Sequence, residues 1–237
     1  MGFPSKRQPS GRARGAATPP SRRGSFVGEP PPRPLHRPSG ASLVAVLAIA
    51  VTFVGIMLMH AVRSDVDPLR EVMSHYANGS RGPAMSIVFY AFGLAALALG
   101  FRLRTAIDHH GVTRAFPILL GLAGICLIAA GVFEVDRPLA PKTMQEVIHS
   151  NSAVAAFVML IVAMLLFSLA CRGDERWWSV RWVSLGLAVM AAVAAIGTQV
   201  LAGYPVSGAV QRLLAGAVLV WFLLVTVRVR RRSFGAA

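Results

Sequence analysis

Residues 149–171 read HSNSAVAAFVMLIVAMLLFSLAC, a run that contains no Asp, Glu, Lys or Arg. About 20 apolar residues are enough for an α-helix to cross the hydrocarbon core of a bilayer. Five further stretches are similarly long and mostly apolar. The six predicted spans are residues 41–62, 83–101, 114–133, 149–171, 180–202 and 206–227. The shorter alternating segments of a membrane β-barrel are absent from the sequence. The sequence therefore predicts an all-α polytopic membrane protein, a bundle of six transmembrane helices.

The composition excludes several other classes of protein. The 237 residues are 55% hydrophobic and 14% charged, and the mean hydropathy is +0.60. A soluble domain carries about 25% charged residues, so a soluble enzyme, a disulfide scaffold and a disordered regulator all fit poorly. The net charge of +14 does not indicate a nucleic-acid partner, because the basic residues lie in tails and short loops between the apolar runs.

Three regions follow from this pattern. Residues 1–40 hold nine of the fifteen prolines and eight Lys or Arg against one acid, Glu29, which predicts a disordered, basic, Pro-rich arm. Residues 41–229 form the predicted transmembrane domain. Residues 230–237 form a basic tail.

The charges predict an orientation. With the N-terminus in the cytoplasm, 18 of the 24 basic residues fall on the cytoplasmic side, together with all of the net positive charge. Both termini are then cytoplasmic. The arm and the tail are expected to contact anionic lipid head groups, at about 1 kcal/mol per basic residue near the surface. The sequence indicates no protein partner.

The two longer outer loops carry local helix signals. Asp67 followed by Pro68 is typical of a helix start, and Leu69, Val72, Met73 and Tyr76 follow at helical spacing before Asn78-Gly79. This pattern predicts a short interfacial helix in the first outer loop. In the second, Thr143 and Glu146 have the spacing of a capping box that opens the fourth span.

The remaining polar residues concentrate at the outer ends of the spans. We expect an extracytoplasmic polar pocket lined by Asp67, Ser74, His75, Asp136, His149 and Arg212. Arg212 lies within an apolar span and needs a partner, for which Asp136 and Asp65 are the candidates. His60 is expected to lie at the membrane interface rather than in this cluster. A purely structural role as helix caps and ion pairs is the competing interpretation.

Three functions remain open at this point. The first is a lipid-interacting membrane protein without a defined activity. The second is a metal-dependent hydrolase or transferase acting on lipid-linked substrates at the outer leaflet, with His75, Asp136 and His149 as zinc ligands. The third is a small-solute transporter, for which charges at the middle of the membrane are missing. No phosphate-binding glycine loop or His-Glu-x-x-His motif occurs in the sequence, so no cofactor is identified.

Three groups of residues resemble one known family. They are Asp67-Pro68 with Ser74, the run Gly131-Val132-Phe133-Glu134-Val135-Asp136 with His149, and Gln211-Arg212 with Trp221. In their order and placement they resemble the family called domain of unknown function 998, over residues 43–229. The resemblance implies a six-helix, multi-pass protein of the bacterial inner membrane. That family has no established biochemical activity, so the resemblance implies a fold and a topology.

Overall fold

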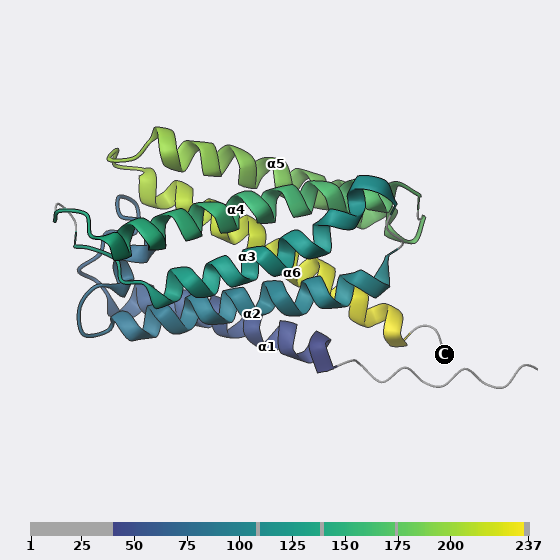
Figure 1. The fold of residues 1–237 in the computed structure, drawn as a ribbon, viewed down its shortest axis with the longest axis horizontal. Helices are drawn as coiled ribbons and strands as arrows, with labels where there is room; N and C mark the ends of the chain where they lie inside the picture. The colour runs from purple at the N-terminus through teal and green to yellow at the C-terminus, as the bar shows by residue number, and fades with distance from the viewer. Residues whose placement is uncertain (1–39, 108–109, 138–139, 174, 235–237) are drawn as a thin grey trace, which may run out of the picture. The chain divides into compact units, whose positions relative to one another are not determined.

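The computed structural model describes residues 40–107, 110–137, 140–173 and 175–234, without the side chains of residues 176 and 231–234. Within these residues the long helices are α1 (Gly40–Val62), α2 (Gly82–Ala106), α3 (Ala115–Val132), α4 (Met144–Ala170), α5 (Trp178–Val200) and α6 (Ser207–Phe234) (Figure 1). Four short 3₁₀ helices lie between them: η1 (Met73–Ala77), η2 (Gly111–Arg114), η3 (Cys171–Gly173) and η4 (Glu175–Trp177). All six long helices are long and apolar enough to cross a membrane. The predicted six-span, all-α fold is confirmed.

Three helix ends lie well outside the predicted spans. Helix α2 continues to Ala106, five residues past the predicted end. Helix α4 begins at Met144, five residues before the predicted span, because the Thr143 side chain accepts a hydrogen bond from the Glu146 backbone N–H. Helix α6 continues to Phe234, through most of the predicted tail. The predicted arm lies outside the described residues except for Gly40, with which α1 begins.

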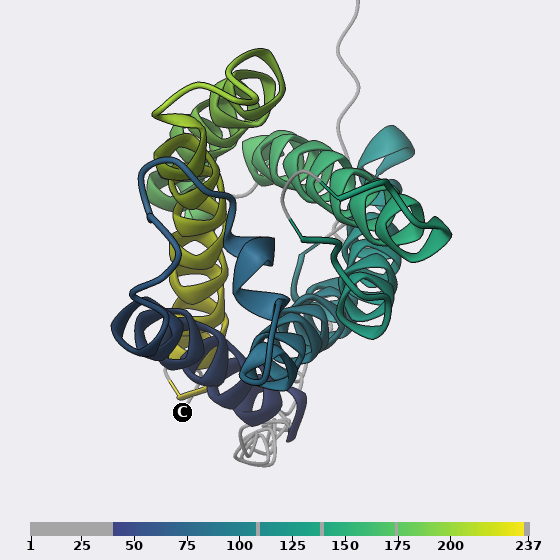
Figure 2. The ribbon, with the colours of Figure 1, turned by 90° about the vertical axis from the view of Figure 1, so that its left-hand side faces the viewer.

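The six helices form a ring in chain order. Each helix packs against the next one, and α6 packs against α1, which closes the ring. Figure 2 shows the ring from one end, with η1 inside it. We call this end, which carries the connections 63–81, 133–143 and 201–206, the η1 end. Helix η1 contacts α2 and α6, so the first connection is folded into the bundle.

Helices α2 and α3 pack closely because glycines meet between them. A Cβ on Gly93 would lie 2.5 Å from the carbonyl oxygen of Gly124, and a Cβ on Gly124 would lie 2.6 Å from the carbonyl oxygen of Gly93. No side chain larger than hydrogen fits at either position. Such close backbone approach is how helices associate in lipid, where apolar side chains gain little by leaving the solvent.

Packing differs between the two ends of the ring. At the end opposite η1, the Phe167 ring lies edge-on to Phe116, Trp177 and Trp221, with centroids 5.3–5.7 Å apart. Further along α4, Ile161 packs with Ala191 and Ala194 of α5. Beyond this contact, towards the η1 end, α4 and α5 diverge (Figure 1).

Candidate functional site

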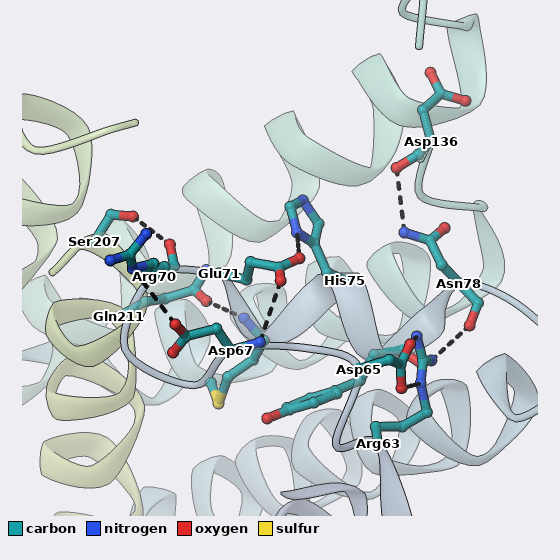
Figure 3. A network of polar contacts seen from close by, with 12 residues as sticks. Arg63, Asp65, Asp67, Arg70, Glu71, His75, Asn78, Asp136, Ser207 and Gln211 are labelled. Atoms are coloured by element: carbon teal, nitrogen blue, oxygen red, sulfur yellow. Dashed lines mark hydrogen bonds and ion pairs between the residues drawn. The ribbon is translucent and has the colours of Figure 1, made fainter. Parts of the chain in front are cut away.

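Arg63 holds the first connection in place. Its Nε and Nη2 donate to the two carboxylate oxygens of Asp65 at 2.8 and 2.7 Å, and its Nη1 donates to the carbonyl oxygens of Tyr76 and Asn78 at 2.8 and 2.6 Å (Figure 3). The hydrogen bonds with Asp65 hold the pKa of Arg63 above its usual value. The same guanidinium holds the pKa of Asp65 below its usual range. Tyr76 and Asn78 lie at the C-terminal end of η1, so the buried Arg63 side chain holds this end of the helix.

The predicted short helix forms, but over fewer residues than the sequence pattern indicates. Asp67 caps only a single turn: its side chain accepts from the Leu69 N–H at 2.9 Å and its carbonyl accepts from the Glu71 N–H at 2.8 Å. Helix η1 itself begins at Met73. Met73 and Tyr76 are buried in the ring whereas Leu69 is 61% exposed, so these apolar residues do not share one face as predicted.

The first connection is also tied to the start of α6. The Ser207 hydroxyl donates to the Arg70 carbonyl at 2.7 Å, and the Met73 N–H donates to Gln211 Oε1 at 2.6 Å (Figure 3). Between them, a Cβ on Gly208 would lie 2.4 Å from the Glu71 carbonyl oxygen. These contacts join residues more than 130 positions apart and leave no space between loop and helix.

Arg212 has neither of the carboxylate partners that the sequence suggested. Its Nε donates to His60 Nε2 at 2.8 Å, Nη1 donates to the carbonyl oxygens of Glu71 and Gly208 at 2.7 and 3.0 Å, and Nη2 donates to the Tyr76 hydroxyl at 3.0 Å. The guanidinium carbon also lies 5.4 Å from the Tyr76 ring centroid. Asp65 pairs with Arg63 instead. Arg212 therefore joins α1, the first connection and α6, and it is not among the residues that line the cavity described next.

His60 takes part in this contact rather than lying alone at an interface. Its Nδ1 donates to the Ile56 carbonyl at 2.7 Å while Nε2 accepts from Arg212. A ring that donates from one nitrogen and accepts at the other is the neutral tautomer.

A cavity of about 650 Å³ opens beside η1. Its rim carries polar side chains from the first connection, the α3–α4 connection, α4 and the end of α5, including Arg70, Glu71, Ser74, His75, Lys142, Glu146 and Gln199. Its floor is formed by apolar side chains of α1, α2 and α4: Ile56, Met85, Val88, Phe89, Phe92, Val154 and Phe157. We call this the amphipathic cavity. Of the six predicted pocket residues, Ser74, His75 and His149 line it.

Within the rim, His75 and Glu71 point towards each other in Figure 3. The distance from His75 Nδ1 to Glu71 Oε2 is 3.1 Å, and both side chains are about one-quarter to one-third exposed. One turn of α4 below Glu146, His149 is 3% exposed and its Nδ1 donates to the Ala130 carbonyl of α3 at 2.6 Å. His149 is thus held by α3 at one nitrogen while it lines the cavity.

Asp136 lies elsewhere, at the start of α4. Its two carboxylate oxygens accept from the Thr143 N–H at 2.6 Å and the Thr143 hydroxyl at 3.0 Å. Asp136 thus completes the predicted cap of α4, in place of the Glu146 side chain, which accepts from the Asp136 N–H and the Ser150 hydroxyl. Asp136 lines a second cavity of about 850 Å³ between α2 and the α3–α4 connection.

The six predicted residues therefore divide into three places. Ser74, His75 and His149 share the amphipathic cavity, Asp136 caps α4, and Asp67 and Arg212 hold the first connection. The structure does not bring His75, Asp136 and His149 together as a zinc site would require. In the described part of the chain, no three His, Cys, Asp or Glu side chains are grouped so that they could hold a metal ion.

The sequence interpretation missed the two carboxylates of the rim, Glu71 and Glu146. Each had a local signal. Glu71 lies four residues before His75, the spacing that brings two side chains together on one helical turn, and Glu146 is three residues before His149.

The comparisons with known proteins agree with the fold. No curated protein and no solved structure matches the chain. A family model described as "Protein of unknown function (DUF998)" matches residues 46–228, which take in α2 to α5, most of α1 and α6, and the amphipathic cavity. The chain is therefore an integral membrane protein that belongs to the DUF998 family.

Proposed function

We propose that this protein binds one amphiphilic molecule, a membrane lipid or a lipid-linked compound, in the amphipathic cavity. The observation that carries the proposal is the division of the cavity into a charged rim and an apolar floor. A volume of about 650 Å³ is within the range of about 300–1,000 Å³ that small-molecule sites occupy.

The depth of the cavity supports a ligand with an acyl chain. From Met144, where α4 begins, to Phe157 on the floor, the helix rises by roughly 20 Å at about 1.5 Å per residue. The hydrocarbon core of a bilayer is about 30 Å thick. The floor therefore lies at the level of lipid tails, and the rim lies at the level of head groups.

The divergence of α4 and α5 supports entry from the membrane. Val154 of α4 is 47% exposed, and Gln199 and Ala202 at the end of α5 are exposed, yet all three line the cavity. A lipid tail can enter sideways between these helices while its head group stays at the rim. A zinc hydrolase has less support, because Asp136 lies in a different cavity from His75 and His149.

The proposal places the η1 end on the extracytoplasmic side of a bacterial inner membrane. The opposite end carries the basic residues Arg102, Arg104, Arg114, Arg172, Arg228 and Arg230, as the positive-inside rule expects of a cytoplasmic face. A cysteine at exposed Ser80 should react with a membrane-impermeant maleimide in intact cells. A cysteine at exposed Thr105 should react only after permeabilisation. The reverse pattern would invert the orientation.

The binding proposal is tested by native mass spectrometry of protein purified in dodecyl maltoside. Wild type should carry a lipid-sized adduct, and Ala153→Phe, which places a ring inside the cavity, should lose it. Val158→Phe is the matched control, because Val158 is 53% exposed on the outer face of the same helix. Equal adducts on wild type and Ala153→Phe would overturn the proposal.

A further inference from the structure

The charges of the amphipathic cavity are not evenly distributed with depth. Arg70 is 68% exposed and its Nε lies 3.5 Å from Asp67, and Lys142 is exposed, so both bases lie at the outside of the rim. Glu71 and Glu146 are half-buried. The inner part of the rim is therefore negative, and partial burial strengthens its attraction for a cation.

Three hydrogen-bond donors that line the cavity already have acceptors. The Ser150 hydroxyl donates to Glu146 Oε1 at 2.6 Å, the Thr198 hydroxyl donates to the Ala194 carbonyl at 2.9 Å, and His149 Nδ1 donates to Ala130. The carboxylates retain capacity, because an ionised carboxylate has about four lone-pair sites and each of these accepts two bonds within the described residues. These three side chains therefore offer a ligand no free donor, whereas both carboxylates still offer acceptors.

His149 points to a ligand independently of the two acids. His149 is only 3% exposed, and it lines the cavity. Among the described residues, none forms a hydrogen bond with its Nε2. Because Nδ1 carries the proton that Ala130 accepts, the neutral ring presents Nε2 as an acceptor. A donor on a molecule bound in the cavity would satisfy this acceptor.

We infer that the amphiphile bound in this cavity carries a protonated amine, attracted by the negative inner rim that Glu71 and Glu146 form and by the acceptor His149 Nε2. An ammonium group has three donors, no acceptor and a positive charge, which suits carboxylates and the acceptor nitrogen of a neutral imidazole. The inference rests on the proposed binding of an amphiphile and names its chemical class. An anionic phosphate head group would find no free guanidinium inside the rim, since the donors of Arg212 are directed to His60, Tyr76 and backbone carbonyls.

The test measures binding of three probes to the detergent-purified protein by native mass spectrometry at about pH 8, where imidazole is neutral and alkyl ammonium is charged. Dodecylamine supplies the amine on a simple chain, and oleoyl-lysophosphatidylethanolamine supplies it on a phospholipid. Oleoyl-lysophosphatidylglycerol has the same tail without an amine. Wild type should bind at least one amine probe about tenfold more tightly than the glycerol probe, as expected for one charge-assisted hydrogen bond. Comparison of the two amine probes identifies whether the phosphate contributes.

Glu71→Gln with Glu146→Gln should remove this preference, because Gln keeps the shape of the side chain and removes its negative charge. Glu134→Gln is the matched control, since Glu134 lines the other cavity. If the double variant does not fold, His149→Phe serves, and it too should reduce amine binding. Equal affinity of wild type for amine and glycerol probes, or a preference kept in the variants, would overturn the inference. If no probe binds and Ala153→Phe changes nothing, it is the binding proposal itself that fails.

Discussion

Replacing Arg212 by Met should destabilise the protein far more than the loss of an exposed charge at the η1 end. Methionine keeps much of the apolar length of the side chain and removes the guanidinium. Four hydrogen bonds disappear with it, to His60, to two backbone carbonyls and to Tyr76.

The size of the effect follows from these contacts. Hydrogen bonds of charged groups contribute about 1.5–3 kcal/mol each, but they are not additive, and removal of a half-buried charge also removes its desolvation cost. We therefore expect a net loss of about 2–4 kcal/mol in the free energy of unfolding. For a chain of this size that lowers Tm by roughly 5–15 °C.

The assay is thermal unfolding in dodecyl maltoside followed by tryptophan fluorescence, with Arg70→Met as the matched control. Arg70 is 68% exposed, and the ion pair of its side chain is the 3.5 Å contact with Asp67, so its loss should change Tm by no more than about 2 °C. Tryptic cleavage after Arg81, in the same connection, should also be faster in Arg212→Met. Equal Tm values for the two variants would refute the structural role assigned to Arg212.

Three further predictions concern single positions. Gly208→Ala should lower Tm because its Cβ would lie 2.4 Å from a backbone oxygen of the first connection, whereas Gly216→Ala on the same helix has open space and should leave Tm unchanged or raise it. Gly93→Ala should separate α2 from α3 and lower Tm, whereas Gly121→Ala, with nothing within 4 Å, should not. Because the guanidinium lowers the pKa of Asp65, the stabilisation by that ion pair is present above the unfolded-state pKa of about 4 and is lost as pH falls through the folded-state value. Asp65→Asn should therefore show a smaller acid-induced decrease in Tm than wild type.

The fold could be predicted because the information that determines it is local and strong. Each span exceeds the length that a bilayer requires, and the six predicted spans fall within the long helices apart from a few end residues. The cap of α4 by Thr143 could also be predicted, because the donor, the Glu146 N–H, is only three residues from the acceptor.

The arrangement of the site could be predicted only in part, because many of its contacts join distant parts of the chain. Arg212 and His60 are 152 positions apart and no sequence pattern pairs them. A carboxylate was expected instead, because it would neutralise the charge of the guanidinium. Asp136 was assigned to the pocket from its residue type, but its local partner Thr143 captures both oxygens. The apolar floor of the cavity could not be predicted from the sequence. In an apolar span, Phe92 and Phe157 look like ordinary lipid-facing residues, and only the packing of the helices into a ring shows that they line a cavity.

Photo-crosslinking from the floor tests the central claim, a lipid inside the ring, most directly. A benzoylphenylalanine at position 157 replaces Phe157, which lines the cavity, and one at position 158 replaces Val158 on the outer face. After detergent washing and irradiation, intact-mass analysis should show a lipid adduct on the first protein and little or none on the second. Equal adducts at both positions, or none at position 157, would contradict the account.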